Sequence, residues 1–126
     1  MRALNIIQTA YRATLEEQDD PVVWITHAMK GAGAELGVLL RGNAVNYTVK
    51  AQLVPPLAFG ARQQRQAPHL AEAISALMDK GIDVHVVVED LADRGLEAEE
   101  LIDGLKPIRR SELPKLLQTY DRVWQW

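Results

Sequence analysis

Two adjacent carboxylates, Glu89 and Asp90, follow the valine-rich run of the segment IDVHVVVEDLADRGL, residues 82–96. In open α/β sheets, ligands collect at the carboxyl ends of the strands. Burial at such a place raises the pKa of a carboxyl group toward the range in which it exchanges protons with a substrate. Glu89 is therefore the candidate catalytic residue, as a general acid or base, and an interface or capping role is the alternative.

Polar side chains also follow the other predicted strands and should meet at the same edge of the sheet. Arg109 and Arg110, after the fourth predicted strand, add positive charge there. The ligand-binding candidates are Gln8, Tyr11, Arg41, Asn43, Glu89, Asp90 and Arg94. Some of them have a structural alternative, because Asn and Asp are preferred helix N-caps and Arg94 can pair with a carboxylate on its own helical turn.

The sequence predicts no metal and no cofactor. His27, His69 and His85 lie in different predicted elements, without the spacing of a metal site. The chain has no cysteine, which excludes thiolate ligands and disulfides. The glycines of GAGAELG, residues 31–37, close a helix and enter a strand, which is the reverse of a dinucleotide-binding fingerprint.

Short β-branched runs alternate with amphipathic segments, a pattern that predicts an α/β fold with a mainly parallel sheet. Strands are expected at 3–8, 36–40, 83–88, 106–108 and 122–126. Helices are expected from Pro21 to Gly31, from Pro68 to Gly81 and after Ser111, with short helical pieces at 43–50, 90–94 and 97–103 and a loop with a helical turn at 11–18.

Capping residues define several of these helix boundaries. Asp20 is the expected N-cap of the first helix, whose buried face should hold Val22, Ile25, Met29 and Ala32. Asn43 is expected to cap the following short helix and Ser111 the last one, where Pro114 lies in the first turn. Gly81 is expected to end the middle helix in a left-handed conformation.

Residues 52–67 form the long connection of the chain. Pro55, Pro56 and Gly60 predict a loop, yet Leu53 and Phe59 make it too apolar to be solvated throughout. We expect it to pack against something. The indoles of Trp124 and Trp126 share one face of the last strand, which indicates either a subunit contact or a cover for the end of the sheet.

Length and charge restrict the class of protein. The 126 residues are expected to form one domain, 1–126. A net charge of −3 gives no reason to bind nucleic acid or anionic lipid, and no apolar run is long enough to span a membrane. Without a hydrophobic leader-like segment after Met1, we expect a cytoplasmic protein.

The order of these segments resembles the DsrE/DsrF-like family of bacterial sulfur-relay and sulfur-oxidation proteins. The resemblance covers nearly the whole chain and depends on ALNII, on KGAG followed by ELGVLLRGNAV, on VHVVVEDLADRGL, and on IRRSELPKLL followed by YDRVWQW. It implies a three-layer α/β/α fold with about five strands that assembles into homotrimers or homohexamers. Sulfur-relaying members carry a cysteine at a place that corresponds here to Val87 or Val88.

That departure removes one function, because a persulfide relay requires a thiolate and valine cannot supply it. Two function classes remain. The first is a non-catalytic, oligomeric DsrE-like accessory protein, linked to sulfur metabolism, that binds a small molecule or a protein partner. The second is an enzyme in which Glu89 acts as general acid or base while Arg41 or Arg94 holds a small anionic substrate. The first is favoured because the sequence shows no complete catalytic constellation.

Overall fold

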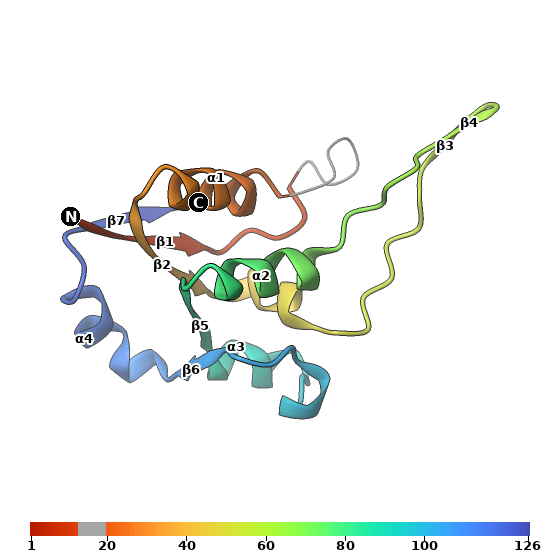
Figure 1. Ribbon diagram of the computed structural model, residues 1–126. Coiled ribbons are helices and arrows are strands. Elements are labelled where there is room, and N and C mark those ends of the chain that lie inside the picture. The colour runs from red at the N-terminus through yellow and green to blue at the C-terminus, as the bar shows by residue number, and fades with distance from the viewer. Residues whose placement is uncertain (13–19) are drawn as a thin grey trace.

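The computed structural model describes residues 1–12 and 20–126, and its centre is a sheet of five parallel strands (Figure 1). The strands are β1 (Arg2–Ile7), β2 (Glu35–Leu40), β5 (Asp83–Val87), β6 (Lys106–Ile108) and β7 (Arg122–Gln125). Their order across the sheet is β6-β5-β2-β1-β7, and each neighbouring pair is parallel. The predicted α/β fold with a parallel sheet of about five strands is confirmed.

Helices pack on both faces of this sheet. The first face is covered by α1 (Pro21–Gly31), α2 (Leu70–Asp79) and the 3-10 helix η1 (Gly42–Thr48). After β5 come α3 (Val88–Asp93) and η2 (Ala98–Glu100), and the second face carries η3 (Arg110–Glu112) with α4 (Leu113–Leu117). Figure 1 shows α1 and α4 on opposite sides of the strands.

The second layer is thin, and one tyrosine closes much of it. Tyr120 packs on Gly37 of β2, where an added Cβ would lie 2.1 Å from the tyrosine hydroxyl oxygen. The guanidinium carbon of Arg2 lies 4.8 Å from the centroid of the same ring, within cation–π range. The absent side chain at Gly37 thus makes the room that the ring occupies.

Asp20 caps α1 as predicted, but the buried face of this helix differs from the prediction. The Asp20 carboxylate accepts hydrogen bonds from the backbone N–H groups of the first helical turn, at 2.8 and 3.3 Å. Val22, Val23 and Thr26 are buried, whereas Ile25 and Met29 are only partly covered and Ala32 is exposed. The reason is polar: the Thr26 hydroxyl accepts a hydrogen bond of 2.9 Å from Nδ2 of the buried Asn5.

The turn after β5 begins earlier than the sequence predicts. The strand was expected to continue through Val88 and the helix to start at Asp90, but β5 ends at Val87 and α3 starts at Val88. Pairing with β6 also ends there, since Val87 is opposite Ile108, the last residue of β6. Glu89 and Asp90 are therefore consecutive residues in the first turn of a helix.

Several other predicted boundaries are wrong. Asn43 lies inside η1, which starts at Gly42 without a side-chain cap, and Ser111 lies inside η3. Pro68 precedes α2 by two residues. The piece expected at 97–103 contains only the short η2, and most of the loop expected at 11–18 falls outside the described residues. Gly81 has the expected positive φ, 82°.

Part of the long connection forms an antiparallel hairpin, β3 (Ala58–Phe59) with β4 (Arg62–Gln63), where the sequence predicts only a loop. Residues 53–67, hereafter the arm, lead away from the body of the molecule (Figure 1). Leu53 and Phe59 are 89% and 74% exposed. Of the apolar groups that we expected to pack against something, Val54 and Leu57 are therefore half-buried, whereas Leu53 and Phe59 have little cover from the described residues.

Candidate functional site

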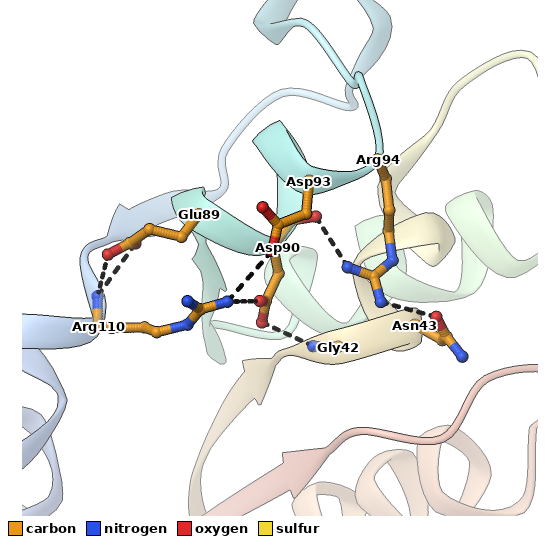
Figure 2. Close-up of polar contacts among 7 residues, drawn as sticks. All are labelled: Gly42, Asn43, Glu89, Asp90, Asp93, Arg94 and Arg110. Carbon is orange, nitrogen blue, oxygen red and sulfur yellow. Dashed lines mark hydrogen bonds and ion pairs between the residues drawn. The ribbon is translucent and has the colours of Figure 1, made fainter.

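The carboxyl ends of the five parallel strands lie at one edge of the sheet, so the residues that follow them meet there. Figure 2 shows the polar contacts at this edge. They join seven residues, of which Asp93, whose side chain is 65% exposed, lies at the rim with one contact of 3.4 Å to Arg110. The other six, hereafter the strand-end network, are Gly42, Asn43, Glu89, Asp90, Arg94 and Arg110. Four of these residues, Asn43, Glu89, Asp90 and Arg94, are among the predicted ligand-binding candidates.

Asp90 is the buried centre of the network, with 6% of its surface exposed. Its Oδ2 accepts a hydrogen bond of 2.8 Å from the Gly42 N–H, and its Oδ1 accepts one from Nη2 of Arg110. Burial raises the pKa of the Asp90 carboxyl, but the Gly42 N–H and the Arg110 guanidinium outweigh burial and hold this pKa below its ordinary value. Asp90 is thus an anion that the protein itself neutralises.

Glu89 lies beside Asp90 on α3 but is only half-buried. Its two carboxylate oxygens accept hydrogen bonds of 3.1 and 3.0 Å from the backbone N–H of Arg110, at an exposed position. Arg110 therefore joins both carboxylates, by its N–H to Glu89 and by its guanidinium to Asp90. The same guanidinium lies 3.4 Å from the Asp93 carboxylate.

Arg94 and Asn43 form the other side of the network. Arg94 donates to the backbone carbonyl oxygen of Asp90 at 3.0 Å and to Oδ1 of Asn43 at 2.7 Å. The structural alternative for Arg94, a pair with a carboxylate on its own turn, takes a different form: its guanidinium binds the backbone carbonyl oxygen of Asp90, and its charge helps to lower the pKa of the Asp90 carboxyl. Asn43 of η1 and Arg94 of α3 connect the turns that follow β2 and β5.

The remaining candidates lie outside this network. Gln8 follows β1, and its Oε1 accepts a hydrogen bond of 2.9 Å from Nε2 of Gln125 in β7. Arg41 follows β2 and donates its backbone N–H to the carbonyl oxygen of Ile7 at 3.1 Å. The sheet therefore brings Gln8 and Arg41 to the same edge as the network, Arg41 directly before Gly42 and Gln8 after the neighbouring strand β1.

Tyr11 belongs to a second polar cluster, at the start of α1. Its N–H donates to the hydroxyl of the buried Tyr47, which in turn donates to the Asp20 carboxylate. The Tyr11 hydroxyl donates to Oε1 of Gln52 at 3.1 Å. Burial first, and then the Asp20 carboxylate, raise the pKa of Tyr47 far above its ordinary value. Tyr47 is therefore a neutral hydrogen-bonding bridge.

Sequence reasoning missed Gly42 and Tyr47 as site residues, and it noted Arg110 without assigning it a contact. Gly42 contributes a backbone N–H, which carries no signal in the residue type. A signal did exist for Arg110, because it follows a predicted strand, but its contact with Asp90 depends on the place of β6 beside β5 in the sheet.

The histidines lie apart in the structure as in the sequence. Nε2 of His27 lies 3.1 Å from the carbonyl oxygen of Ala73, and burial lowers the pKa of His85 in β5. Within 1–12 and 20–126, no group of three or more histidine or acidic side chains is placed to hold a metal ion. In that same part of the chain, no helix has the length and apolar composition needed to cross a membrane.

A hollow of the surface lies beside the strand-end network. It has a volume of about 530 Å³ and lies between β6 and the segment formed by α3 and η2. Its apolar wall includes Val86, Val88, Leu91, Leu96, Leu105 and Pro107. Glu97 and Asp103 also line it. None of the seven predicted ligand-binding residues lines this hollow, hereafter the groove.

Comparison with known proteins places this geometry in a family. The DsrE/DsrF-like family matches residues 7–126. The fold is similar to that of the YchN protein from E. coli, with a TM-score of 0.71 at 16% identity over 100% of both chains. It is also similar to MTH1491, a protein of unknown function from Methanobacterium thermoautotrophicum, with a TM-score of 0.64 at 10% identity over 99% of this chain and 98% of that one.

Among curated proteins, none matches the chain. The family match nevertheless spans all but the first six residues, and the five-stranded parallel sheet agrees with the solved structures. The chain has no cysteine at any position, and valines stand where β5 passes into α3. It therefore belongs to the DsrE/DsrF-like family, as a member that lacks the cysteine able to carry a persulfide.

Proposed function

We propose that this chain is a non-catalytic accessory protein of sulfur metabolism that acts in the cytoplasm as a homotrimer or homohexamer and binds a small molecule or a protein partner. The observation that carries the proposal is the turn from β5 to α3. It has valine, not cysteine, at positions 87 and 88. A thiolate is the nucleophile and carrier in persulfide transfer, and the chain has none.

The contacts of the neighbouring carboxylates support a binding protein over an enzyme. The Asp90 carboxylate accepts from Gly42 and Arg110, and the Glu89 carboxylate accepts from the Arg110 N–H. Groups that are satisfied in this way hold the turns together and have less capacity left for a substrate. The cluster is explained by the stability that it gives to the sheet edge.

Exposed aromatic groups support self-association. Trp24 on α1 is 59% exposed and Trp126 is 43% exposed, and both are residue types enriched in protein interfaces. Trp124, on β7, is half-buried. Because β7 is an edge strand of the sheet, an indole on it is well placed to contact another subunit.

The alternative is an enzyme that uses Glu89 as general acid or base. The half-buried position of Glu89 at a strand end, with Arg110 bonded to it and Arg94 near the end of the same helix, favours it. Against it, the Arg94 guanidinium is already bound to Asn43 and to the Asp90 carbonyl oxygen. The Arg41 side chain is then the arginine left to hold an anionic substrate in this alternative.

Native mass spectrometry and light scattering of protein purified directly from cells test the proposal. We expect an oligomeric mass and a retained small molecule or protein. We expect Glu89→Gln to keep both, as should the matched control Asp93→Asn, whose side chain is 65% exposed. A monomeric mass contradicts the proposed assembly. A turnover that Glu89→Gln abolishes without unfolding the protein contradicts the non-catalytic role and supports the enzyme.

A further inference from the structure

The arm and the groove have complementary properties. The arm carries the exposed apolar side chains of Leu53 and Phe59. Its sequence, LVPPLAFGARQQRQA, has two arginines and no acidic residue. The groove is apolar inside, and the segment that borders it, residues 97–103, has the sequence EAEELID, with four acidic residues and no basic one. Both surfaces thus present apolar side chains, and their charges are opposite in sign.

The hairpin of the arm needs support that its own chain does not give it. Gln64 donates its N–H to the Leu57 carbonyl oxygen at 2.7 Å, and its Oε1 accepts from the Leu57 N–H at 3.1 Å. These bonds join the arm to itself. A lone two-stranded hairpin is only marginally stable in water, so a hairpin that places Phe59 at its exposed tip gains most from being buried elsewhere.

The base of the arm, in contrast, is fixed to the body. Nε2 of Gln52 donates to the carbonyl oxygens of Tyr47 and Val49, at 3.0 and 2.9 Å. A fixed base orders the direction in which the arm leaves the body, which lowers the entropy that is lost on binding. The arm is therefore presented to its surroundings in a defined direction.

The groove is suitable as the acceptor. Its volume of about 530 Å³ lies within the range of about 300–1,000 Å³ that is typical of binding pockets. Val88, Leu96 and Leu105 give it an apolar wall, and the carboxylate residues Glu97 and Asp103 also line it. In Figure 1 the arm rises to the upper right, whereas the segment after α3 lies at the bottom of the view.

We propose that the arm of one subunit inserts Phe59 into the groove of a second copy of this chain, with Arg62 and Arg65 facing the acidic segment 97–103. The proposal rests on the self-association proposed above and names its surfaces. The arm and the groove are different patches. If two copies exchange arms reciprocally, the contact closes a dimer; if each copy passes its arm to the next one, it closes a ring such as the proposed trimer or hexamer when the rotation permits.

Charge exchange between the two surfaces tests the proposal by light scattering at several protein concentrations. Arg62→Glu with Arg65→Glu should weaken self-association about ten-fold or more, and so should Glu99→Lys with Asp103→Lys. All four substitutions together should restore it. Phe59→Ser should weaken assembly, whereas Ala32→Ser, at an exposed position outside both surfaces, should leave it unchanged.

The absence of native cysteines allows a direct test of proximity. Ala61→Cys chains mixed with mass-tagged Ala98→Cys chains should form a mixed disulfide dimer on mild oxidation, because Ala61 follows the arm tip and Ala98 lines the groove. Ala61→Cys mixed with Ala32→Cys, which is exposed at the end of α1, is the matched control. Equal yields from the two mixtures overturn the proposal.

The outcomes separate this inference from the proposed function. If the natural protein is oligomeric but neither charge set nor Phe59→Ser changes its mass, only the contact between arm and groove is wrong. If the natural protein is a monomer at every concentration, the proposed assembly is wrong and the contact with it.

Discussion

The strand-end network and the arm differ in how far their side chains find partners within the chain. In the network, a buried carboxylate is matched by a backbone N–H and a guanidinium from two other turns of the same chain. In the arm, apolar side chains are 74–89% exposed at Phe59 and Leu53. The region whose sequence suggested chemistry is thus internally complete, and the region whose sequence suggested a loop is the one that still lacks a partner. Substitutions in the network should therefore change stability, and substitutions in the arm should change assembly.

The largest effect is expected from Asp90→Ala. It removes the acceptor of the Gly42 N–H, and a buried group that loses its partner costs about 2–3 kcal/mol. Urea unfolding at one fixed protein concentration measures this loss. Asp93→Ala, at an exposed carboxylate on the same helix, is the control and should cost under about 0.5 kcal/mol. Equal losses for the two variants would break the distinction between network and surface.

Tyr47→Phe should have the next largest effect. The change keeps the buried ring but removes the hydroxyl that binds the Tyr11 N–H and the Asp20 carboxylate. We expect a loss of about 1–2 kcal/mol in the free energy of unfolding, because both partners are left with one bond fewer. Thermal unfolding followed by circular dichroism measures it. A gain in stability would show that the buried hydrogen bonds of this second polar cluster, unlike those of the strand-end network, do not stabilise the fold.

Acid should weaken the contribution of Asp90. Its pKa in the folded protein lies below the ordinary value of 3.8, so the unfolded chain takes up the proton first as the pH falls. The stabilisation is fully present above about pH 4 and is lost as the pH falls through the folded pKa. The stability difference between the natural protein and Asp90→Asn should therefore stay constant from about pH 7 to about pH 5 and shrink below about pH 4. A difference that grows in acid would contradict the lowered pKa.

The smallest effect on folding is expected from the arm. Phe59→Ser removes an exposed ring, so the free energy of unfolding at a protein concentration low enough to disfavour assembly should stay within about 0.5 kcal/mol of the natural value. The same variant should reduce the oligomeric mass at high concentration. If Phe59→Ser destabilises the dilute protein, the arm contributes to folding stability as the network does, and the contrast between the two regions is wrong.

The sequence predicts the fold well because its elements are encoded locally. Apolar runs rich in valine, isoleucine and leucine mark β1, β2 and β5, and Asp20 before Pro21 marks the start of α1. Which face of a helix is buried depends more on contacts with residues that are distant in sequence. The apolar spacing of Ile25 and Met29 pointed to one face of α1, but the need of Asn5 for a hydrogen-bond partner turned Thr26 inward.

The candidate site is only partly predictable, for a physical reason. Which strands end in polar residues can be read along the chain, and four of the seven ligand-binding candidates do meet in one network. Their partners are distant in sequence: Asp90 binds Gly42 across 48 positions and Arg110 across 20. Such pairs follow from the order of the strands in the sheet, which local patterns do not encode. Backbone donors such as the Gly42 N–H leave no trace in residue type.

The place of β1 inside the sheet has a kinetic consequence. β1 pairs with β2 on one side and with β7 on the other, and the Arg2 N–H donates at 2.7 Å to Asp121, 119 positions away. Pairings between residues so distant form slowly, because the entropy of closing a long loop is lost before the contacts that stabilise the pairing can form. During synthesis, one edge of β1 therefore stays unpaired until β7 emerges. We expect refolding to end with the docking of β7, and until then the half-finished sheet exposes an edge to other nascent chains.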